Sequence, residues 1–283
     1  CLLLCWCETH CAPLDPYRPV GCCLGSIICA FMRRRQLFQN LNRAAMALAW
    51  QQLFAPVSHA QMPLMADWVA PGDVFTLGVA SGEPRPDSVV LWTRLAPEPL
   101  KVGGGMPSAS VPVRWTVAAD ARFERILASG TEWAQADAGH SVHAEVRGLE
   151  PDRTYFYRFE AGGQTSSAGR TRTAPALDAP NQRLRFALAS CQHYEHGYFT
   201  AHREMAGADI DVVLFVGDYI YESSNPQYAI RKHSSEEPKT LAEYRVRYEQ
   251  YKGDPALQAA HAAHPWVLMW DDHEVVNDYA NDQ

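Results

Sequence analysis

Hydrophobic and polar positions follow two different patterns in the two halves of the chain. Between residues 74 and 173, apolar and polar residues alternate in short runs separated by Pro, Gly and Asp; these runs cover 74–79, 88–94, 113–118, 142–146 and 155–160. Successive side chains of a strand point to opposite faces of a sheet, so these runs predict half-buried antiparallel strands. Their spacing is typical of a β-sandwich.

The segment 146–157 resembles the corner of fibronectin-type sandwiches. In such a corner Leu149 enters the core and Tyr155 closes the turn. Chemically reactive residues are not concentrated in this half of the chain. We therefore interpret it as a structural or positioning domain.

Beyond a Pro-containing linker at 174–182 the pattern changes to longer apolar runs. The runs 184–190, 212–216 and 266–270 are typical of buried strands, and helical periodicity is found over 197–206, 241–251 and 255–263. Pro255 stands at the first turn of the last helix, a position where proline is tolerated. Strands that alternate with helices predict an α/β domain.

Composition and charge narrow the possible functions. The chain has 283 residues, of which 47% are hydrophobic, and a formal net charge of -7. These values are typical of a globular protein and argue against a specific nucleic-acid-binding surface, which needs clustered Lys and Arg. If such a protein acts on phosphate groups, we expect a metal ion rather than a cluster of Lys and Arg to neutralise their charge.

Seven of the eight cysteines precede residue 32, and only Cys191 follows. Residues 1–31 also lack an initiating Met and show no clear period. We interpret them as a non-native segment, translated from upstream of the true start at Met32. Two alternatives remain open, a Cys-rich metal knuckle and an additional membrane anchor, although paired CxxC spacing is absent and the apolar run 22–31 is short for a membrane span.

An export signal is predicted for residues 32–60. Three arginines (33–35) precede Leu37 and Phe38, an Ala- and Leu-rich stretch covers 44–55, and Ser58 and Ala60 are small residues at the cleavage-determining positions. The pattern resembles a twin-arginine signal, which predicts passage through the twin-arginine export machinery and a periplasmic or secreted mature protein with no transmembrane span. A generic amphipathic helix is the alternative.

Polar clusters follow each of the three predicted buried strands. They are residues 190–193 (Ser-Cys-Gln-His), 217–222 (Gly-Asp-Tyr-Ile-Tyr-Glu) and 271–278 (Asp-Asp-His-Glu-Val-Val-Asn-Asp). Ligand sites of α/β sheets lie beyond the carboxyl ends of the strands. Three such clusters on neighbouring strands therefore predict one shared site.

These clusters, together with the motifs at 78–84 and 88–94, resemble the PhoD type of alkaline phosphatase and phosphodiesterase, within the metallophosphoesterase superfamily. The resemblance extends from about residue 70 to the end of the chain. It implies an all-β fibronectin- or Ig-like sandwich over residues 68–175. A truncated α/β metallophosphoesterase domain of the layered α-β-β-α type is implied for residues 181–283.

The resemblance also implies roles for individual residues. Asp218 would bridge two metal ions, since a carboxylate has two oxygens. Tyr221 as phenolate and Cys191 as thiolate would bind Fe³⁺. A turn-forming role for Asp218 and a buried aromatic role for Tyr221 are the structural alternatives. For Cys191 the alternatives are an inert thiol or a catalytic nucleophile, and the latter is disfavoured because no phosphate loop follows it.

The third cluster is expected to serve the second metal and the substrate. Asn277 is the preferred ligand of a hard cation such as Ca²⁺, with Asp272 as the alternative. His273 would hydrogen-bond the phosphate or protonate the leaving oxygen.

Together these features predict an exported metal-dependent phosphoesterase. It would hydrolyse phosphomonoesters, phosphodiesters or both through a metal-bound hydroxide, on small-molecule or polymeric phosphate esters. The alternatives are a phospholipase D-like phosphodiesterase of the same family and a non-catalytic binding module. Because no histidine follows His273, we expect metal ligands to be missing and this chain, as an N-terminal fragment, to be inactive.

Overall fold

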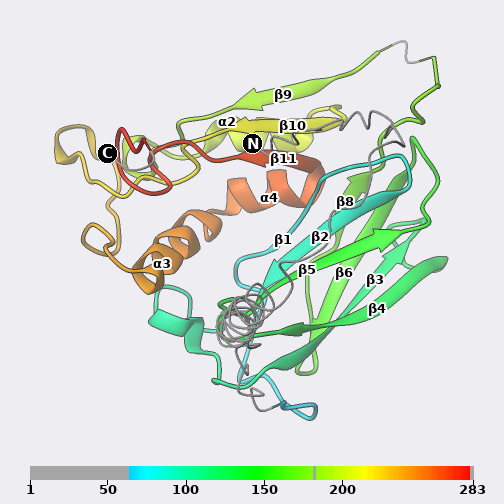
Figure 1. Ribbon diagram of the computed structural model, residues 1–283, viewed down its shortest axis with the longest axis horizontal. Coiled ribbons are helices and arrows are strands. Elements are labelled where there is room, and N and C mark those ends of the chain that lie inside the picture. The colour runs from blue at the N-terminus through cyan, green and yellow to red at the C-terminus, as the bar shows by residue number, and fades with distance from the viewer. Residues whose placement is uncertain (1–63, 181–182, 281–283) are drawn as a thin grey trace, which may run out of the picture. The chain divides into compact units, whose positions relative to one another are not determined.

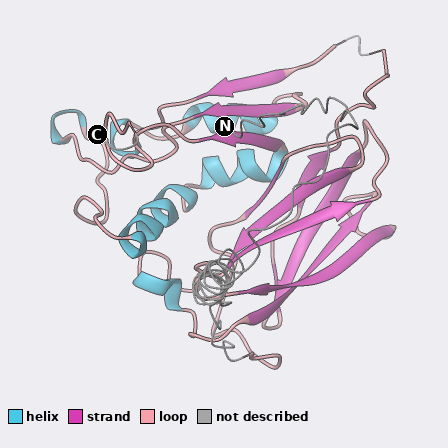
Figure 2. Ribbon diagram, viewed as in Figure 1, coloured by secondary structure: helices cyan, strands magenta, loops and turns pink. Residues whose placement is uncertain are grey.

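The computed structural model describes residues 64–180 and 183–280 of the chain. The predicted upstream segment 1–31 and the predicted signal peptide 32–60 lie outside the described residues. Figures 1 and 2 show the arrangement of helices and strands.

The strands are β1 Val79–Gly82, β2 Ser88–Arg94, β3 Val111–Ala118, β4 Ile126–Ala134, β5 Ser141–Arg147, β6 Thr154–Ala161, β7 Gln164–Thr165, β8 Gly169–Arg172, β9 Phe186–Ala189, β10 Val212–Val216 and β11 Pro265–Met269. The α-helices are α2 Thr200–Gly207, α3 Leu241–Lys252 and α4 Pro255–Ala263. Short 3₁₀ helices are η1 Val102–Gly105, η2 Tyr194–His196 and η3 Pro226–Tyr228.

The strands form two sheets. One sheet has the order β5-β2-β1-β11-β10-β9, and the other has the order β4-β3-β6-β7 with β8 also paired to β6. Strands β9, β10 and β11 are mutually parallel, and β11 also pairs in parallel with β1, where Gly82 lies opposite Trp266. The first half of the sequence therefore shares a hydrogen-bonded sheet with the second half.

The first hydrophobic core lies between the two sheets. Alternate residues of β2 and β5 face alternate residues of β3 and β6, including the fully buried Leu91, Val113, Tyr157 and Phe159. The period-two pattern of the sequence therefore marks the inward face of each strand. At the corner before β6, the Tyr155 hydroxyl bonds the backbone of Glu150, and Leu149 is buried as expected.

The second core lies between one face of β10 and β11 and the helices. Val213, Phe215 and Trp266 pack against Leu257 of α4 and Tyr251 of α3. The two helices have N-terminal caps that the sequence encodes locally. Thr240 and Glu243 form a capping box before α3, and the Asp254 carboxylate accepts hydrogen bonds from the first turn of α4.

An ion pair buried in the protein interior joins the two halves a second time. Arg94, at the end of β2, pairs with the Glu249 carboxylate of α3. Burial lowers the pKa of Arg94 and raises the pKa of Glu249, although each partner opposes the shift of the other. An uncompensated charge at this depth is costly, so the pair holds α3 against β2.

The structure corrects one predicted strand and adds one that was not predicted. The run 74–79 is mostly not a strand, because a turn closed by a hydrogen bond from Gly78 N to Phe75 O interrupts it, and β1 begins only at Val79. Gly78 has a φ of 72°, which favours glycine. Strand β4 was not predicted, because most of its residues are exposed or partly exposed at the sheet edge and its apolar alternation is weak.

The predicted buried strands of the second half are buried on one face only. Leu188 of β9 and Met269 of β11 are 63% and 60% exposed, and Val216 of β10 is also exposed. Among the described residues, the helices cover the opposite face of these strands. Continuous apolar runs predict burial on both faces, and the described part of the chain supplies only one covering layer.

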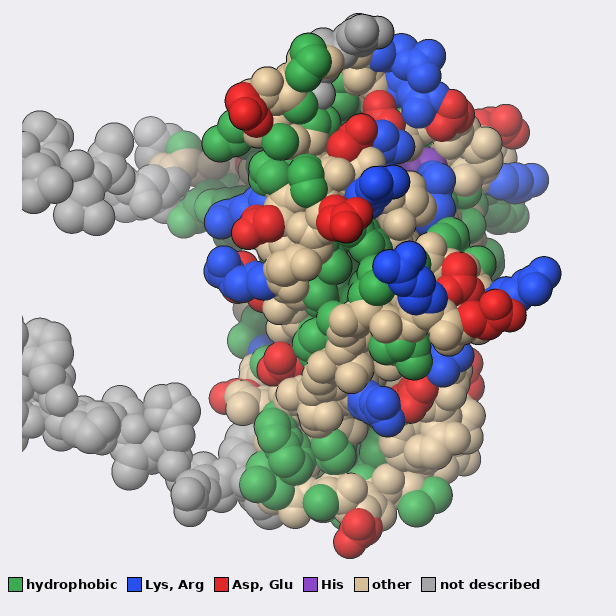
Figure 3. All heavy atoms as spheres, turned by 90° about the vertical axis from the view of Figure 1, so that its right-hand side faces the viewer, with side chains coloured by type: hydrophobic (Ala, Val, Ile, Leu, Met, Phe, Trp, Pro, Cys, Tyr) green, Lys and Arg blue, Asp and Glu red, His purple; other side chains and the backbone are tan. Residues whose placement is uncertain are grey.

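Positive and negative side chains are interspersed on the face shown in Figure 3. Ion pairs of the described residues include Arg172 with Asp152 and Arg185 with Asp211. No helix of the described residues is long and apolar enough to cross a membrane.

Candidate active site

The turn after β10 carries the residue at the centre of the candidate site. Gly217 has a φ of 97° and Asp218 a φ of 56°, so two successive residues adopt the left-handed region. A Cβ atom at position 217 would lie 2.4 Å from the Asp271 Cβ. Only glycine permits this close approach, which brings the turn against the segment that follows β11.

Asp218 is 6% exposed, and its two carboxylate oxygens differ in their surroundings. Oδ2 accepts a hydrogen bond of 2.8 Å from the Tyr221 hydroxyl. Oδ1 is buried and has no hydrogen-bond partner among the described residues. A buried carboxylate oxygen without a donor is unfavourable, and a bound cation would satisfy it.

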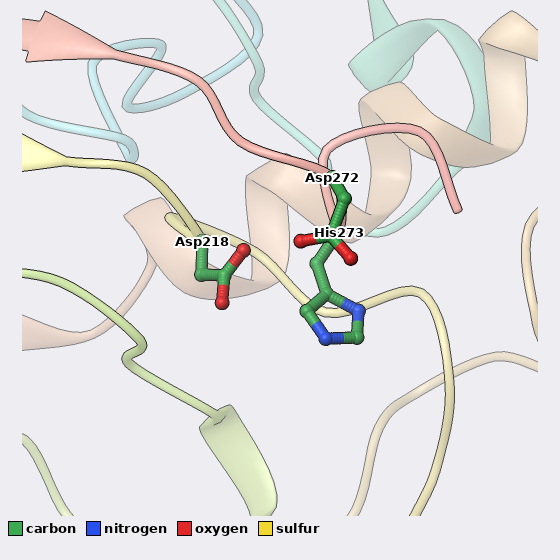
Figure 4. A group of neighbouring side chains, drawn as sticks. All are labelled: Asp218, Asp272 and His273. Carbon is green, nitrogen blue, oxygen red and sulfur yellow. The ribbon is translucent and has the colours of Figure 1, made fainter. Parts of the chain in front are cut away.

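Two residues from the loop after β11 join Asp218. Ligand-type atoms of Asp218, Asp272 and His273 all lie within 4.8 Å of one another. Figure 4 shows the three side chains on the loops that continue from two neighbouring strands, β10 and β11. Two carboxylates and an imidazole are a donor set that divalent and trivalent metal ions accept, so the residues present fit a metal ion.

Glu222 orients the imidazole of His273. Nδ1 of His273 lies 2.8 Å from Oε2 of Glu222, which is 3% exposed, and Oε1 of Glu222 accepts the backbone N–H of Asn277 at 3.0 Å. With Nδ1 engaged, Nε2 of His273 remains available to a ligand or substrate. Burial alone lowers the pKa of His273, but the hydrogen bond and charge of Glu222 outweigh it, so the pKa lies above its ordinary value.

Cys191 reaches the site from the end of β9. Its backbone N–H donates to Gly217 O at 3.2 Å, and Gln192 donates to Asp218 O at 3.2 Å, so the two turns run side by side. Cys191 is a free, exposed cysteine with a φ of 55° and is not part of the group of mutually close ligand atoms. Burial raises the pKa of the Tyr221 phenol well above its usual value, and contacts with Asp218 and Cys191 raise it further.

Asn277 and Asp272 occupy different settings. The Asn277 side chain is exposed, and its amide donates to Asp278 Oδ2 at 2.7 Å. Asp272 is half-buried in the group with Asp218, and its own Oδ2 accepts the backbone N–H of Asp278. The structure therefore brings Asp272, the alternative of the two predicted ligands, next to Asp218.

Three residues near the site were given no role from the sequence. Glu222 bonds the imidazole of His273, and Glu274 accepts a backbone N–H of the Asp218 turn. The centre of the His193 ring lies 4.5 Å from that of Tyr221 and 3.9 Å from that of His196. All three belong to the polar clusters at the strand ends. Their position in those clusters was a signal, but their partners depend on how the loops meet.

An apolar cavity of about 450 Å³ is lined in part by Tyr219 and Glu274, which stand next to Asp218 and His273 in the sequence. Trp92, Tyr248, Trp266 and Lys252 are among its lining residues, whereas Asp218, Asp272 and His273 do not line it. Burial lowers the pKa of Lys252 to about 7. The cavity is adjacent to the candidate site but does not contain its chemical groups.

The fold and the site together define the class of protein. The second half is an α/β unit whose site, with two carboxylates and an imidazole, lies at the carboxyl ends of parallel strands. One sheet joins this unit to the strand-rich N-terminal half. Residues 62–175 match the family described as PhoD-like phosphatase, N-terminal domain, and residues 186–283 match PhoD-like phosphatase. The chain belongs to the PhoD-like phosphatase family.

Individual relatives agree with this assignment. The chain is 55% identical over 212 residues to alkaline phosphatase D of Bacillus subtilis (strain 168), a match that covers 73% of this chain and 36% of that protein. A solved structure of PhoD is 53% identical, with a TM-score of 0.72, covering 75% of this chain and 42% of that one. The match therefore spans about a third of the length of the curated relative.

Proposed function

We propose that this protein is a metal-dependent phosphoesterase that hydrolyses phosphomonoesters, phosphodiesters or both. One observation carries the proposal: the buried Oδ1 of Asp218 has no hydrogen-bond partner among the described residues and lies in a group with Asp272 and His273. Membership of the PhoD-like phosphatase family supports the same reading.

Asp218 and Asp272 would hold a cation, and His273, Tyr221 and Cys191 border the same site. The metals would be Fe³⁺ and Ca²⁺, of which Tyr221 and Cys191 would hold the iron and Asp272 or Asn277 the calcium. When bound, the cations supply Lewis-acid chemistry, polarising the phosphoryl group and generating a nucleophile from water near neutral pH.

His273 would handle the proton. Its Nδ1 is engaged by Glu222, so Nε2 can hydrogen-bond a phosphoryl oxygen or donate a proton to the leaving oxygen of the ester. Because the pKa of His273 lies above its ordinary value, a larger fraction of its imidazole is protonated than in a free histidine, as a general acid requires. Asp218, whose Oδ2 accepts the Tyr221 hydroxyl, would orient Tyr221 toward the same centre.

At the level of architecture, we assign the first half to a fibronectin- or Ig-like sandwich. The second half corresponds to the first part of a layered α-β-β-α metallophosphoesterase fold. The two packed sheets and the parallel β9-β10-β11 order support these assignments.

The protein would act outside the cytoplasm, in the periplasm or as a secreted protein. The arginine run at 33–35, followed by Leu37 and Phe38, supports export by the twin-arginine machinery. Replacing Arg33, Arg34 and Arg35 with Lys should leave precursor in the cytoplasm in a fractionation experiment. Unchanged export would contradict this route.

Metal binding is the first test, because it depends on residues of the described chain. The full chain is titrated with Ca²⁺ and Fe³⁺ by calorimetry beside Asp218→Asn, with exposed Asp137→Asn as a matched control. We expect wild type and the control to bind and Asp218→Asn to lose at least about tenfold in affinity. Equal binding by all three proteins would contradict the proposed site.

Substrate class is tested with the metal-loaded protein on p-nitrophenyl phosphate, bis(p-nitrophenyl) phosphate and phosphatidylcholine vesicles. Release of p-nitrophenol that Asp218→Asn abolishes supports the phosphoesterase, and the ratio of the first two rates separates monoesters from diesters. Selective hydrolysis of the vesicles would instead identify a phospholipase D-like phosphodiesterase.

A further inference from the structure

Glu274 lies in the loop after β11, one residue beyond His273, but its carboxylate points back to the turn after β10. Oε2 accepts the backbone N–H of Asp218 at 3.2 Å and that of Asp271 at 2.8 Å. Oε1 accepts the backbone N–H of Tyr219. One side chain therefore binds three backbone donors from two loops.

The turn needs such a partner for two reasons. Strand β10 ends at Val216, so the N–H groups of Asp218 and Tyr219 have left the parallel ladder. Asp218 also has a φ of 56°, a conformation that is uncommon for a residue with a side chain. The Glu274 carboxylate satisfies both N–H groups and holds this conformation.

The close approach at Gly217 shows that the two loops are in direct contact. A Cβ at position 217 would meet the Asp271 Cβ at 2.4 Å, and the Glu274 carboxylate accepts the backbone N–H of Asp271 and that of Asp218, the residue after Gly217. Glu274 forms no salt bridge among the residues that the structure describes. Its charge is met by backbone dipoles instead, as in other carboxylates that bind successive N–H groups.

We propose that Glu274 is a positioning residue that locks the Asp218 turn to the loop carrying Asp272 and His273. It brings the ligand atoms of the two loops into register without contacting metal or substrate itself. The proposal rests on the proposed function, because it assigns Glu274 to the assembly of that metal site.

Two substitutions of Glu274 test this role. Glu274→Gln keeps the size of the side chain but replaces one acceptor oxygen with a donor group, so at least one of the three backbone N–H groups loses its partner. Glu274→Asp keeps the charge but shortens the reach by one methylene. Both variants should release the turn, and Glu204→Gln, on an exposed position of α2, is the matched control.

The first measurement is hydrogen exchange of the full chain without metal, followed by NMR. Glu274→Gln and Glu274→Asp should speed exchange at Asp218, Tyr219 and Asp271 by about tenfold or more. Core amides of Val117 and Phe159 should exchange as in wild type, which establishes that the variants are folded. Unchanged exchange at the three positions in either variant overturns the proposal.

The second measurement is Ca²⁺ affinity by calorimetry on the same proteins. Both Glu274 variants should bind at least about tenfold more weakly than wild type and Glu204→Gln. Faster exchange with wild-type affinity would show a purely structural contact and would also overturn the proposal. If the wild-type chain binds no Ca²⁺, the proposed metal site fails, and the exchange rates alone then decide on Glu274.

Discussion

His273 and Glu222 form a partly buried pair: Nδ1 of the imidazole lies 2.8 Å from Oε2 of the carboxylate, although 51 positions separate them in the sequence. The imidazole comes from the loop after β11, and Glu222 comes from the segment after β10. The pair therefore forms only when these two segments meet at one edge of the sheet. It sets which nitrogen of His273 faces the group with Asp218 and Asp272.

Glu222→Gln should release His273 from a single tautomer. A neutral amide binds the Nδ1–H more weakly than a carboxylate does, so ¹⁵N NMR of the ring should show a mixture of tautomers in place of the Nδ1–H form. Metal affinity or phosphoester hydrolysis should fall by roughly 10- to 100-fold. Glu237→Gln, at an exposed loop position, is the control. An unaltered ring spectrum would refute the orienting role of Glu222.

Tyr221→Phe should abolish a visible absorption band of the Fe³⁺-loaded full chain. The phenol donates to Asp218 and its pKa is raised, so only a strongly charged cation could stabilise a phenolate here. Absorption spectra of the variant and of Tyr228→Phe, a control at an exposed position, would be compared with wild type. A band that survives in Tyr221→Phe would mean that Tyr221 does not bind the iron.

Gly217→Ala should be more destabilising than Gly148→Ala, although both positions have a positive φ. At Gly148 nothing lies within 4 Å of the added Cβ, so the cost comes from the backbone alone and is about 1 kcal/mol. At Gly217 the added Cβ meets Asp271, which should add about 1–3 kcal/mol. Denaturant unfolding of the two variants measures the difference, and equal losses would argue against the close contact of the loops.

Acid should destabilise the protein through His202. Burial lowers the pKa of His202 to about 4 in the folded protein, whereas the unfolded chain titrates near its ordinary value of about 6.5. The unfolded state therefore binds more protons between these values, and stability falls as pH falls from about 6.5 to about 4.

The contribution of His202 to this loss is at most about 3 kcal/mol. His202→Gln should flatten the dependence of the unfolding free energy on pH in this window, whereas His196→Gln, at an exposed position, should not. Parallel pH profiles for wild type and His202→Gln would contradict the assignment.

Local patterns in the sequence determined much of the fold. The period-two runs marked the strands β2, β3, β5 and β6, because alternation is the signature of a strand with one buried face. Helical periodicity marked α3 and α4, and Pro255 marked the start of α4, because proline is tolerated in the first turn of a helix. The polar clusters marked the strand ends that carry Asp218 and His273.

Tertiary structure decided what these patterns do not contain. The pairing of β1 with β11, the open face of β9 to β11, and the position of Asp272 beside Asp218 all depend on contacts between distant segments. So do the partners of Glu222 and Glu274, whose side chains reach across to another loop. Periodicity reports which face of an element is apolar, but a hydrogen bond between loops depends on where folding brings their backbones together.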